Sequence, residues 1–293
     1  MLHPNPNMLV KIAQGDAFGM SCEFRNKNLV EALRFEKYIR HPEWGPSEGF
    51  YTDDTQMSIA VARCLLAKSL TKEDFAHAFV LCYKRDPRGG CYARGFQKIL
   101  DSVWGGGELL RVLDPKSTKN GATMRSVPLG VLPTKEEVIR VAEVQASVTH
   151  DTYGGILSSQ AVALASHFAL YESEPLSEVL DYVNDYLGKD LLDWMGGPVR
   201  EPEIGLATAR AVLTLLRTET SLLGIARKCL TWGGDTDSVL AIAWGIASAR
   251  MREDLPPFFW DDLEDGSFGR TYLSNLGSVL TSAYASSHGL NGA

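Results

Sequence analysis

The sequence has few cysteines, and their spacing is not that of a disulfide framework or a zinc site. Its five cysteines are odd in number and lie mostly within apolar runs, and no Cys-x-x-Cys pair occurs in the 293 residues. Small disulfide-rich proteins and zinc ribbons need paired or closely spaced cysteines. We therefore expect buried thiols in a reducing compartment and predict a cytoplasmic location.

Signals for secretion, membrane insertion and nucleic-acid binding are also missing. The first residues, Met1-Leu-His-Pro-Asn-Pro-Asn7, contain no charged stretch followed by a long apolar segment, and no uncharged apolar run reaches the length of a bilayer crossing. The net charge of −7 leaves no basic excess to neutralise phosphates. We expect neither a membrane nor a nucleic-acid strand as a partner.

Strand patterns are absent, whereas helical periodicity is present along most of the chain. No stretch alternates apolar and polar residues over the length of a strand, no repeat has a fixed period, and no composition shift marks a linker. We predict an all-α protein, a compact multi-helix bundle forming a single domain over residues 1–293. The expected helices are Met8–Glu23, Gln56–Lys68, Ala76–Tyr83, Lys135–Gln145, Gly155–Tyr171, Pro175–Leu187, Gly205–Leu216, Ser221–Leu230, Val239–Ala249 and Tyr272–Ala285.

Two long segments rich in glycine and proline separate these helices, residues 24–50 and 104–133. Both are expected to be irregular. A region of that length without its own secondary structure is more often functional than idle, so we expect them to shape substrate selectivity.

Residues Gly233-Gly-Asp-Thr-Asp-Ser238 precede a run of apolar and small residues, Val239–Ala249. The run has no polar face, which predicts a helix buried on all sides. Two glycines free the backbone for a tight turn, so Asp235 and Asp237 can converge at the start of that helix. The alternative is that Asp235 only caps the helix.

A second acidic turn, Thr52-Asp53-Asp54-Thr55, opens another helix. If the two turns meet, four carboxylates share one pocket and repel one another unless cations neutralise them. Two divalent ions would balance the charge, and an all-oxygen ligand set suits Mg²⁺ or Mn²⁺ better than zinc. The alternative is that the turns never meet and each belongs to a separately capped helix.

Five ordered motifs resemble those of the ADP-ribosylglycohydrolases, the family that includes the dinitrogenase reductase-activating glycohydrolase. The resemblance covers nearly the whole chain and implies a compact all-α fold, a centre of two Mg²⁺ or Mn²⁺ ions, and cleavage of ADP-ribose from a modified side chain. The motifs are Gly15-Asp-Ala-Phe-Gly19 with Glu23, Thr52–Thr55, Asn120-Gly121 with Met124-Arg125, Thr149-His150, and Gly233–Ser238.

The resemblance also assigns site residues. Glu23 matches the carboxylate near the ribose, and Asp54 and Asp235 would act with it in catalysis. His150 and Arg125 would contact the pyrophosphate, with helix entry and loop fixing as their structural alternatives. The implied metal ligands are Thr52, Asp53, Asp54, Asp235, Asp237 and Ser238, and further implied substrate contacts are Asn120, Gly121 and Met124.

The chain departs from the family at the glycine-rich phosphate loop. That loop often reads Gly-Tyr-Gly-x-Gly, and here it is Cys91-Tyr92-Ala93-Arg94-Gly95. Arg94 would supply a charge where the family uses backbone amides, or would be a solvated surface arginine. Tyr92, Phe96 and Tyr153 are candidates to stack on adenine.

The resemblance implies hydrolysis by water attack at the anomeric carbon, with the metals polarising the water and Glu23 stabilising the developing charge or moving a proton. We expect N-linked ADP-ribosylarginine on a protein or conjugate as the substrate, nucleic acid only if itself modified, and a monomeric protein. Open alternatives are an O-linked serine ADP-ribose hydrolase, a two-metal phosphohydrolase acting on an ADP-ribose-like pyrophosphate, and a non-catalytic ADP-ribose-binding protein.

Overall fold

The computed structural model of the chain describes residues 3–86, 91–188, 196–200 and 204–285. Within these ranges all regular secondary structure is helical, apart from two isolated bridges, Lys116 with His150 and Val199 with Gly234. The all-α prediction is therefore confirmed. The elements are α1 (Met8–Gly19), η1 (Met20–Cys22), α2 (Leu29–Ala32), α3 (Asp53–Ala67), α4 (Lys72–Arg85), α5 (Arg94–Ser102), α6 (Gly106–Val112), α7 (Gly121–Met124), η2 (Val127–Val131), α8 (Lys135–Ala146), α9 (Tyr153–Tyr171), η3 (Leu176–Glu178), α10 (Val179–Leu187), α11 (Ile204–Thr218), α12 (Leu222–Trp232), α13 (Thr236–Ala247), α14 (Phe258–Asp261) and α15 (Arg270–Ala285).

The centre of the molecule is the pair α1 and α13, which make the most extensive contact of any two elements in the described part of the chain. Every residue of α13 is buried, as predicted for the apolar run that begins at Val239. A Cβ on Gly15 would lie 2.6 Å from the Leu240 carbonyl oxygen, and one on Gly19 would lie 2.4 Å from that of Thr236. These two glycines therefore let the backbones of α1 and α13 touch, which brings the ends of the two helices together.

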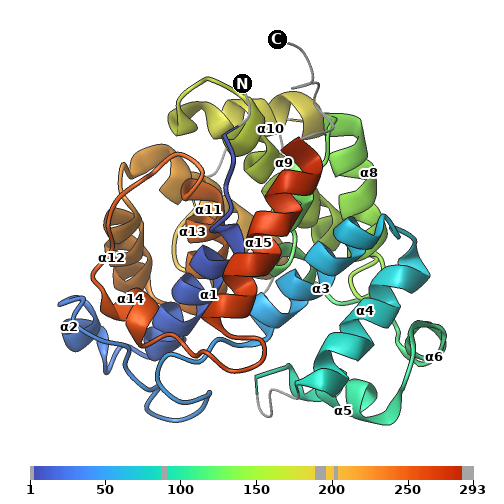
Figure 1. Cartoon of the computed structure of the whole chain (residues 1–293), viewed down its shortest axis with the longest axis horizontal. Helices are drawn as coiled ribbons and strands as arrows, with labels where there is room; N and C mark the ends of the chain where they lie inside the picture. The colour runs from blue at the N-terminus through green and yellow to red at the C-terminus, as the bar shows by residue number, and fades with distance from the viewer. Residues whose placement is uncertain (1–2, 87–90, 189–195, 201–203, 286–293) are drawn as a thin grey trace.

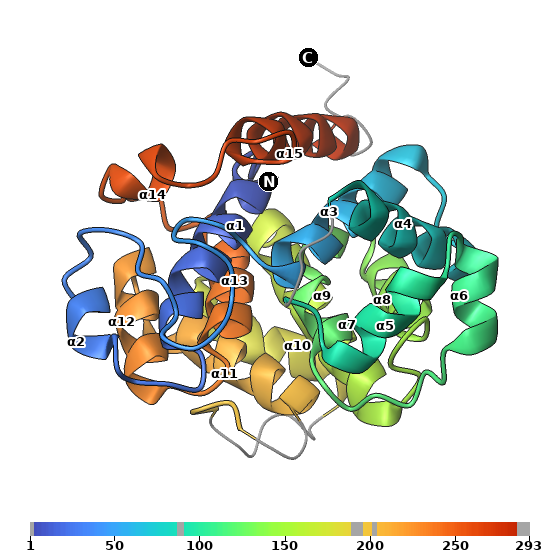
Figure 2. The same cartoon turned by 90° about the horizontal axis from the view of Figure 1, so that it is seen from below.

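The remaining helices lie on two sides of this pair. In Figures 1 and 2, α3 to α6 are on one side, and α2, α12 and α14 are on the other. Figure 2 shows α1 between α13 and α15. Residues near the N-terminus thus pack between elements from the last third of the chain. No helix in the described ranges has both the length and the apolar character that a bilayer crossing requires.

The helix predictions are correct in type and need three corrections in extent. The first helix ends at Gly19, and a 3-10 turn follows, so Glu23 lies just beyond that turn rather than inside a helix. The helix expected at Ala76–Tyr83 runs from Lys72 to Arg85, and the capping start that the sequence Thr71-Lys-Glu-Asp predicts is confirmed by a capping box of Thr71 and Asp74. Residues 24–50 and 104–133 are not irregular throughout, since α2 lies within the first segment and α6, α7 and η2 lie within the second. These elements have only four, seven, four and five residues, too few to produce a recognisable period.

Candidate metal centre

The turn before α13 presents Asp235 without using it as a helix cap. Gly233 and Gly234 have φ angles of 69° and 85°, the left-handed region in which glycine is favoured. Asp235 occupies the N-cap position, yet its side chain makes no capping hydrogen bond. Its Oδ2 instead accepts a hydrogen bond of 3.0 Å from Asn120 Nδ2. The alternative that Asp235 only caps the helix is therefore wrong.

The turn before α3 is held in place by Asp16 of α1. The Asp16 carboxylate accepts hydrogen bonds of 3.0 Å from the Thr52 backbone N–H and of 2.6 Å from the Thr55 hydroxyl. Thr52 is the N-cap of α3, because its hydroxyl accepts a 3.4 Å hydrogen bond from the Asp54 backbone N–H. A buried carboxylate thus fixes the turn, while Asp54 remains available for another partner.

The two turns meet, as the sequence predicts. Two sets of carboxylates, Asp16 with Asp54 and Asp237, and Glu23 with Asp235 and Asp237, each offer one oxygen per residue within 4.8 Å of the others. We call these five residues the acid centre. All are buried except Glu23, which is half-buried.

Three oxygens of the acid centre lack a partner. Oδ1 of Asp54, Asp235 and Asp237 are each buried without a hydrogen-bond partner among the described residues. A buried polar atom without a partner costs about 1–3 kcal/mol, more if charged, so three of them in one place call for a ligand. Carboxylate oxygens are the ligands that Mg²⁺ and Mn²⁺ prefer. The residues present therefore fit divalent cations of this kind.

The electrostatics of the acid centre favour the same conclusion. Burial, with repulsion from neighbouring carboxylates, raises the pKa of Glu23 to about 7 and those of Asp53, Asp54 and Asp237 well above their ordinary range. Burial raises the pKa of Asp16 to about 6, with the Thr55 and Thr52 donors opposing it. Without a cation this much negative charge is unfavourable at neutral pH. A bound divalent ion reverses that balance.

A cavity of about 380 Å³ opens on the acid centre. Its volume is in the range of small-molecule sites. Two cationic residues, Arg94 and Lys119, line it, and so do the aromatic residues Phe24 and Trp44. Of the predicted site residues, those lining it are Glu23, Thr52, Asp53, Asp54, Tyr92, Arg94, Asn120, Met124, Asp235, Asp237 and Ser238.

Five predicted substrate contacts do not line this cavity: Gly95, Gly121, Arg125, His150 and Tyr153. Gly95 is exposed, and Tyr153 has 70% of its surface exposed. The His150 ring packs on Gly121, because a Cβ there would lie 2.9 Å from His150 Cε1. His150 Nε2 is buried with no hydrogen-bond partner among the described residues. Their roles as substrate contacts remain predictions.

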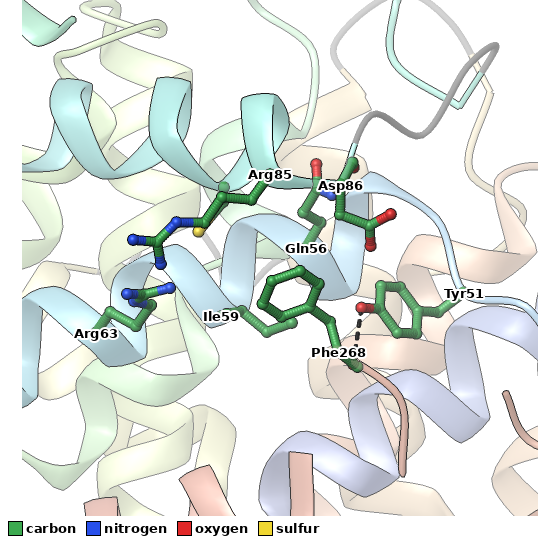
Figure 3. A pocket seen from close by; sticks show the side chains of 8 residues that line it. Tyr51, Gln56, Ile59, Arg63, Arg85, Asp86 and Phe268 are labelled. Carbon is green, nitrogen blue, oxygen red and sulfur yellow. Dashed lines mark hydrogen bonds between the residues drawn. The ribbon is translucent and has the colours of Figure 1, made fainter. Parts of the chain in front are cut away.

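Tyr92 lines the cavity but is oriented by a contact outside it. Its hydroxyl donates a 2.5 Å hydrogen bond to Gln56 Oε1, and Gln56 Nε2 donates one of 2.5 Å to the Asp86 carbonyl. Figure 3 shows Gln56 and Asp86 beside a second pocket, where the Tyr51 hydroxyl donates to the Phe268 carbonyl. That pocket has about 10 Å³, room for one water molecule at most. Only 3% of Tyr92 is exposed, so it offers little ring surface for stacking.

Sequence reasoning missed several residues of the site, among them Asp16, Lys119 and Trp44. Asp16 was visible as a polar residue between glycines on an apolar helix, a signal that a buried carboxylate has a specific task. Trp44 had no signal, because it lies in the 24–50 segment, and its contact with Glu23 depends on how that segment folds back.

Residues 8–288 match the sequence profile of the ADP-ribosylglycohydrolase family. The chain belongs to this family. Its members are ADP-ribosyl hydrolases. The chain is 25% identical over 267 residues to ADP-ribosylhydrolase ARH3 of Xenopus tropicalis, an alignment covering 72% of this chain and 76% of the relative. It is 29% identical over 147 residues to ADP-ribosyl-[dinitrogen reductase] glycohydrolase of Rhodospirillum rubrum, covering 48% of this chain and 49% of the relative.

The fold is shared with a solved structure described as an ADP-ribosylglycohydrolase-related protein complex. The TM-score is 0.75 at 20% sequence identity, and the match covers 95% of this chain and 97% of that one. An all-helical chain can adopt many arrangements, so agreement over nearly the full length shows that this chain has the fold of that structure.

Proposed function

We propose that this protein uses two divalent cations, Mg²⁺ or Mn²⁺, to hydrolyse the bond between ADP-ribose and a modified side chain. The observation that carries the proposal is the acid centre, in which two carboxylate sets share Asp237 and leave three buried oxygens without a partner. When bound, such ions hold sugar hydroxyls and favour deprotonation of a water near neutral pH.

The chain's own residues prepare this chemistry. Asp54, Asp235 and Asp237 would hold the cations, with the Thr52 and Ser238 hydroxyls, which line the same cavity, completing the oxygen set. Asp16 and Asn120 keep Asp54 and Asp235 in place, the first through the Thr52 turn and the second through its amide. Metal ligands that are themselves hydrogen-bonded lose little order on binding.

Glu23 would act on the reacting sugar. Its carboxylate would stabilise positive charge developing at the anomeric carbon or move a proton there. The cationic residues Arg94 and Lys119 line the same cavity, where they would neutralise a pyrophosphate. The cavity thus offers groups that would contact the ribose and the pyrophosphate of an ADP-ribose.

The first linkage to test is N-linked arginine, the second O-linked serine. Peptides carrying ADP-ribose on either residue are incubated with the protein in Mg²⁺, Mn²⁺ or EDTA, and free ADP-ribose is measured. We expect release with a divalent ion and none with EDTA. Equal release in EDTA would overturn the metal requirement.

Free ADP-ribose, added as a further substrate and as a ligand, distinguishes the other candidate activities. Release of AMP from free ADP-ribose would identify a phosphohydrolase, in which paired ions act on the pyrophosphate. Tight ADP-ribose binding without hydrolysis of either peptide would identify a binding protein.

A further inference from the structure

Trp44 makes a direct contact with the carboxylate of Glu23. Its indole Nε1–H donates a 2.7 Å hydrogen bond to Glu23 Oε2. Both residues line the cavity over the acid centre. The contact joins side chains 21 positions apart, so the 24–50 segment must fold back across the cavity to make it.

The turn that carries Trp44 also holds the backbone of Glu23. His41 Nδ1 is 3.2 Å from the Glu43 backbone N–H and 3.1 Å from that of Trp44, so it is the accepting nitrogen. The ring hydrogen is therefore on Nε2, which donates a 2.9 Å hydrogen bond to the Glu23 carbonyl. One short turn thus fixes Glu23 at both its carbonyl and its carboxylate.

The indole itself has little freedom to rotate. The His41 ring lies 4.0 Å from the Trp44 ring, centroid to centroid, at an interplanar angle of 34°. The Arg25 guanidinium carbon lies 5.0 Å from the Trp44 centroid, and that guanidinium pairs with both carboxylate oxygens of Glu43. Trp44 is therefore a preorganised donor, although 37% of its surface is exposed.

Glu23 needs such a donor because its neighbours repel it. One of its oxygens lies within 4.8 Å of oxygens of Asp235 and Asp237. An unrestrained carboxylate on a half-exposed side chain would turn toward solvent, away from like charge. The Trp44 hydrogen bond opposes that rotation.

We propose that Trp44 is a positioning residue that holds the Glu23 carboxylate over the acid centre in its reactive orientation. This inference rests on the proposed hydrolase function. Trp44 would act through Glu23 rather than by binding ADP-ribose, so its loss should slow the chemical step and leave substrate affinity unchanged.

The test is Trp44→Phe, which keeps an aromatic ring beside His41 and removes only the N–H donor. Trp104→Phe is the matched control, since Trp104 is 75% exposed and does not line the cavity. On the peptide that the wild type hydrolyses, we expect kcat to fall about tenfold or more for Trp44→Phe, as for loss of a hydrogen bond to a charged group, with KM unchanged. Trp104→Phe should behave as the wild type.

A second measurement does not depend on activity or on the folding of the variant at Trp44. In the ¹⁵N-labelled protein the Trp44 indole N–H resonance should be shifted and protected from exchange, and Glu23→Gln should move it while leaving the Trp104 resonance in place. Unchanged kcat in a folded Trp44→Phe, a rise in KM alone, or a Trp44 resonance that Glu23→Gln does not move would each overturn the inference.

The experiment distinguishes failure of the inference from failure of the proposed function. If the wild type hydrolyses neither peptide, the proposed function fails and the inference fails with it. If the wild type is active and Trp44→Phe is equally active, the inference alone fails.

Discussion

Two buried polar regions of this protein differ in whether their atoms have partners. In the acid centre, three carboxylate oxygens have none among the described residues. Around Arg125, by contrast, Nε donates a 2.6 Å hydrogen bond to Gln145 Oε1, and Nη2 donates to the Gln145 carbonyl and to the Thr149 hydroxyl. Gln145 Nε2 in turn donates to Ser126 and Ser159. We call these five residues the arginine network.

This difference distinguishes the acid centre, a candidate binding site, from the arginine network, which has a structural role. The arginine network contains a buried cation and no carboxylate, and the Arg125 guanidinium carbon lies 4.2 Å from the Phe79 ring centroid. Burial lowers the pKa of Arg125 to about 9. Because the described residues of the network are hydrogen-bonded to one another, we infer that the network stabilises the fold. The acid centre, in contrast, requires a ligand that the chain itself does not supply. The alternative that Arg125 fixes a loop fits this position.

The largest expected effect comes from removing a carboxylate of the acid centre. Asp54→Ala or Asp235→Ala should abolish hydrolysis and lower metal occupancy, while the far-UV circular dichroism of the helices stays nearly unchanged. Each variant removes a proposed cation ligand and one source of charge repulsion, so the fold should lose little. Turnover by ADP-ribose release and metal content by mass spectrometry are the measurements.

Asp114→Ala is the control, since Asp114 is an exposed residue in a surface ion pair with Lys116. It should keep full activity and metal content. Full activity in Asp54→Ala would show that the acid centre is not needed for hydrolysis, and its contrast with the arginine network would no longer hold.

The next effect concerns stability. Arg125→Ala would leave Gln145 and Thr149 without a buried donor and open a cavity beside Phe79, and we expect the free energy of unfolding to fall by about 3 kcal/mol. Urea denaturation measures it. Arg34→Ala, on an exposed arginine of the surface, should change stability by less than about 0.5 kcal/mol.

Metal affinity should be kept in folded Arg125→Ala. A variant that lost turnover at unchanged stability would instead show that Arg125 acts on the substrate, as the family resemblance implies.

The two turns of the acid centre could be predicted from the sequence because each has a local signature, whereas the expectation that they meet comes from the family resemblance. Glycines before Asp235 and a capping threonine before Asp53 mark the starts of two helices, and both signals depend only on neighbouring residues. The small residues of the first helix and of Val239–Ala249 also indicated close packing. The meeting of α1 with α13 then follows from glycines whose added Cβ atoms would clash with the partner backbone.

What could not be predicted depends on contacts between distant segments. The Asp16 anchor, the Glu23 contact with Trp44 and the arginine network each join residues 14 or more positions apart in the chain. Periodicity carries no information about such pairs. The short helices within residues 104–133 were missed for the other reason, that a single turn has no period to detect.

A smaller effect is expected beside the acid centre. Asn120 Nδ2 donates 3.0 Å to Asp235 Oδ2 and 3.3 Å to the Thr208 hydroxyl, so it orients a proposed ligand without belonging to the acid centre. Asn120→Ala should lower Mn²⁺ affinity by about 10- to 100-fold, as for other residues that orient a metal ligand. Isothermal titration calorimetry measures it.

Asn7→Ala is the matched control, because the exposed Asn7 side chain makes no capping bond. Unchanged Mn²⁺ affinity in Asn120→Ala would place Asn120 with the supporting residues instead.

The smallest effect is a pH dependence that only the acid centre should show. In EDTA the pKa of Glu23 is raised to about 7 by burial and by the nearby Asp235, above the ordinary value near 4.5. Between these values the folded protein binds more protons at Glu23 than the unfolded chain does, so this residue lowers stability as pH rises from 5 to 7. We therefore expect the free energy of unfolding of Glu23→Gln, relative to that of the wild type, to increase by about 1–2 kcal/mol over this range. Saturating Mg²⁺ or Mn²⁺ should reverse the difference by stabilising the wild type. Urea denaturation of both proteins at pH 5, 6 and 7 measures this effect. A difference in the free energy of unfolding that does not change with pH would mean that the neighbouring carboxylates do not destabilise the charged form of Glu23. Repulsion in the acid centre would then involve only the aspartates.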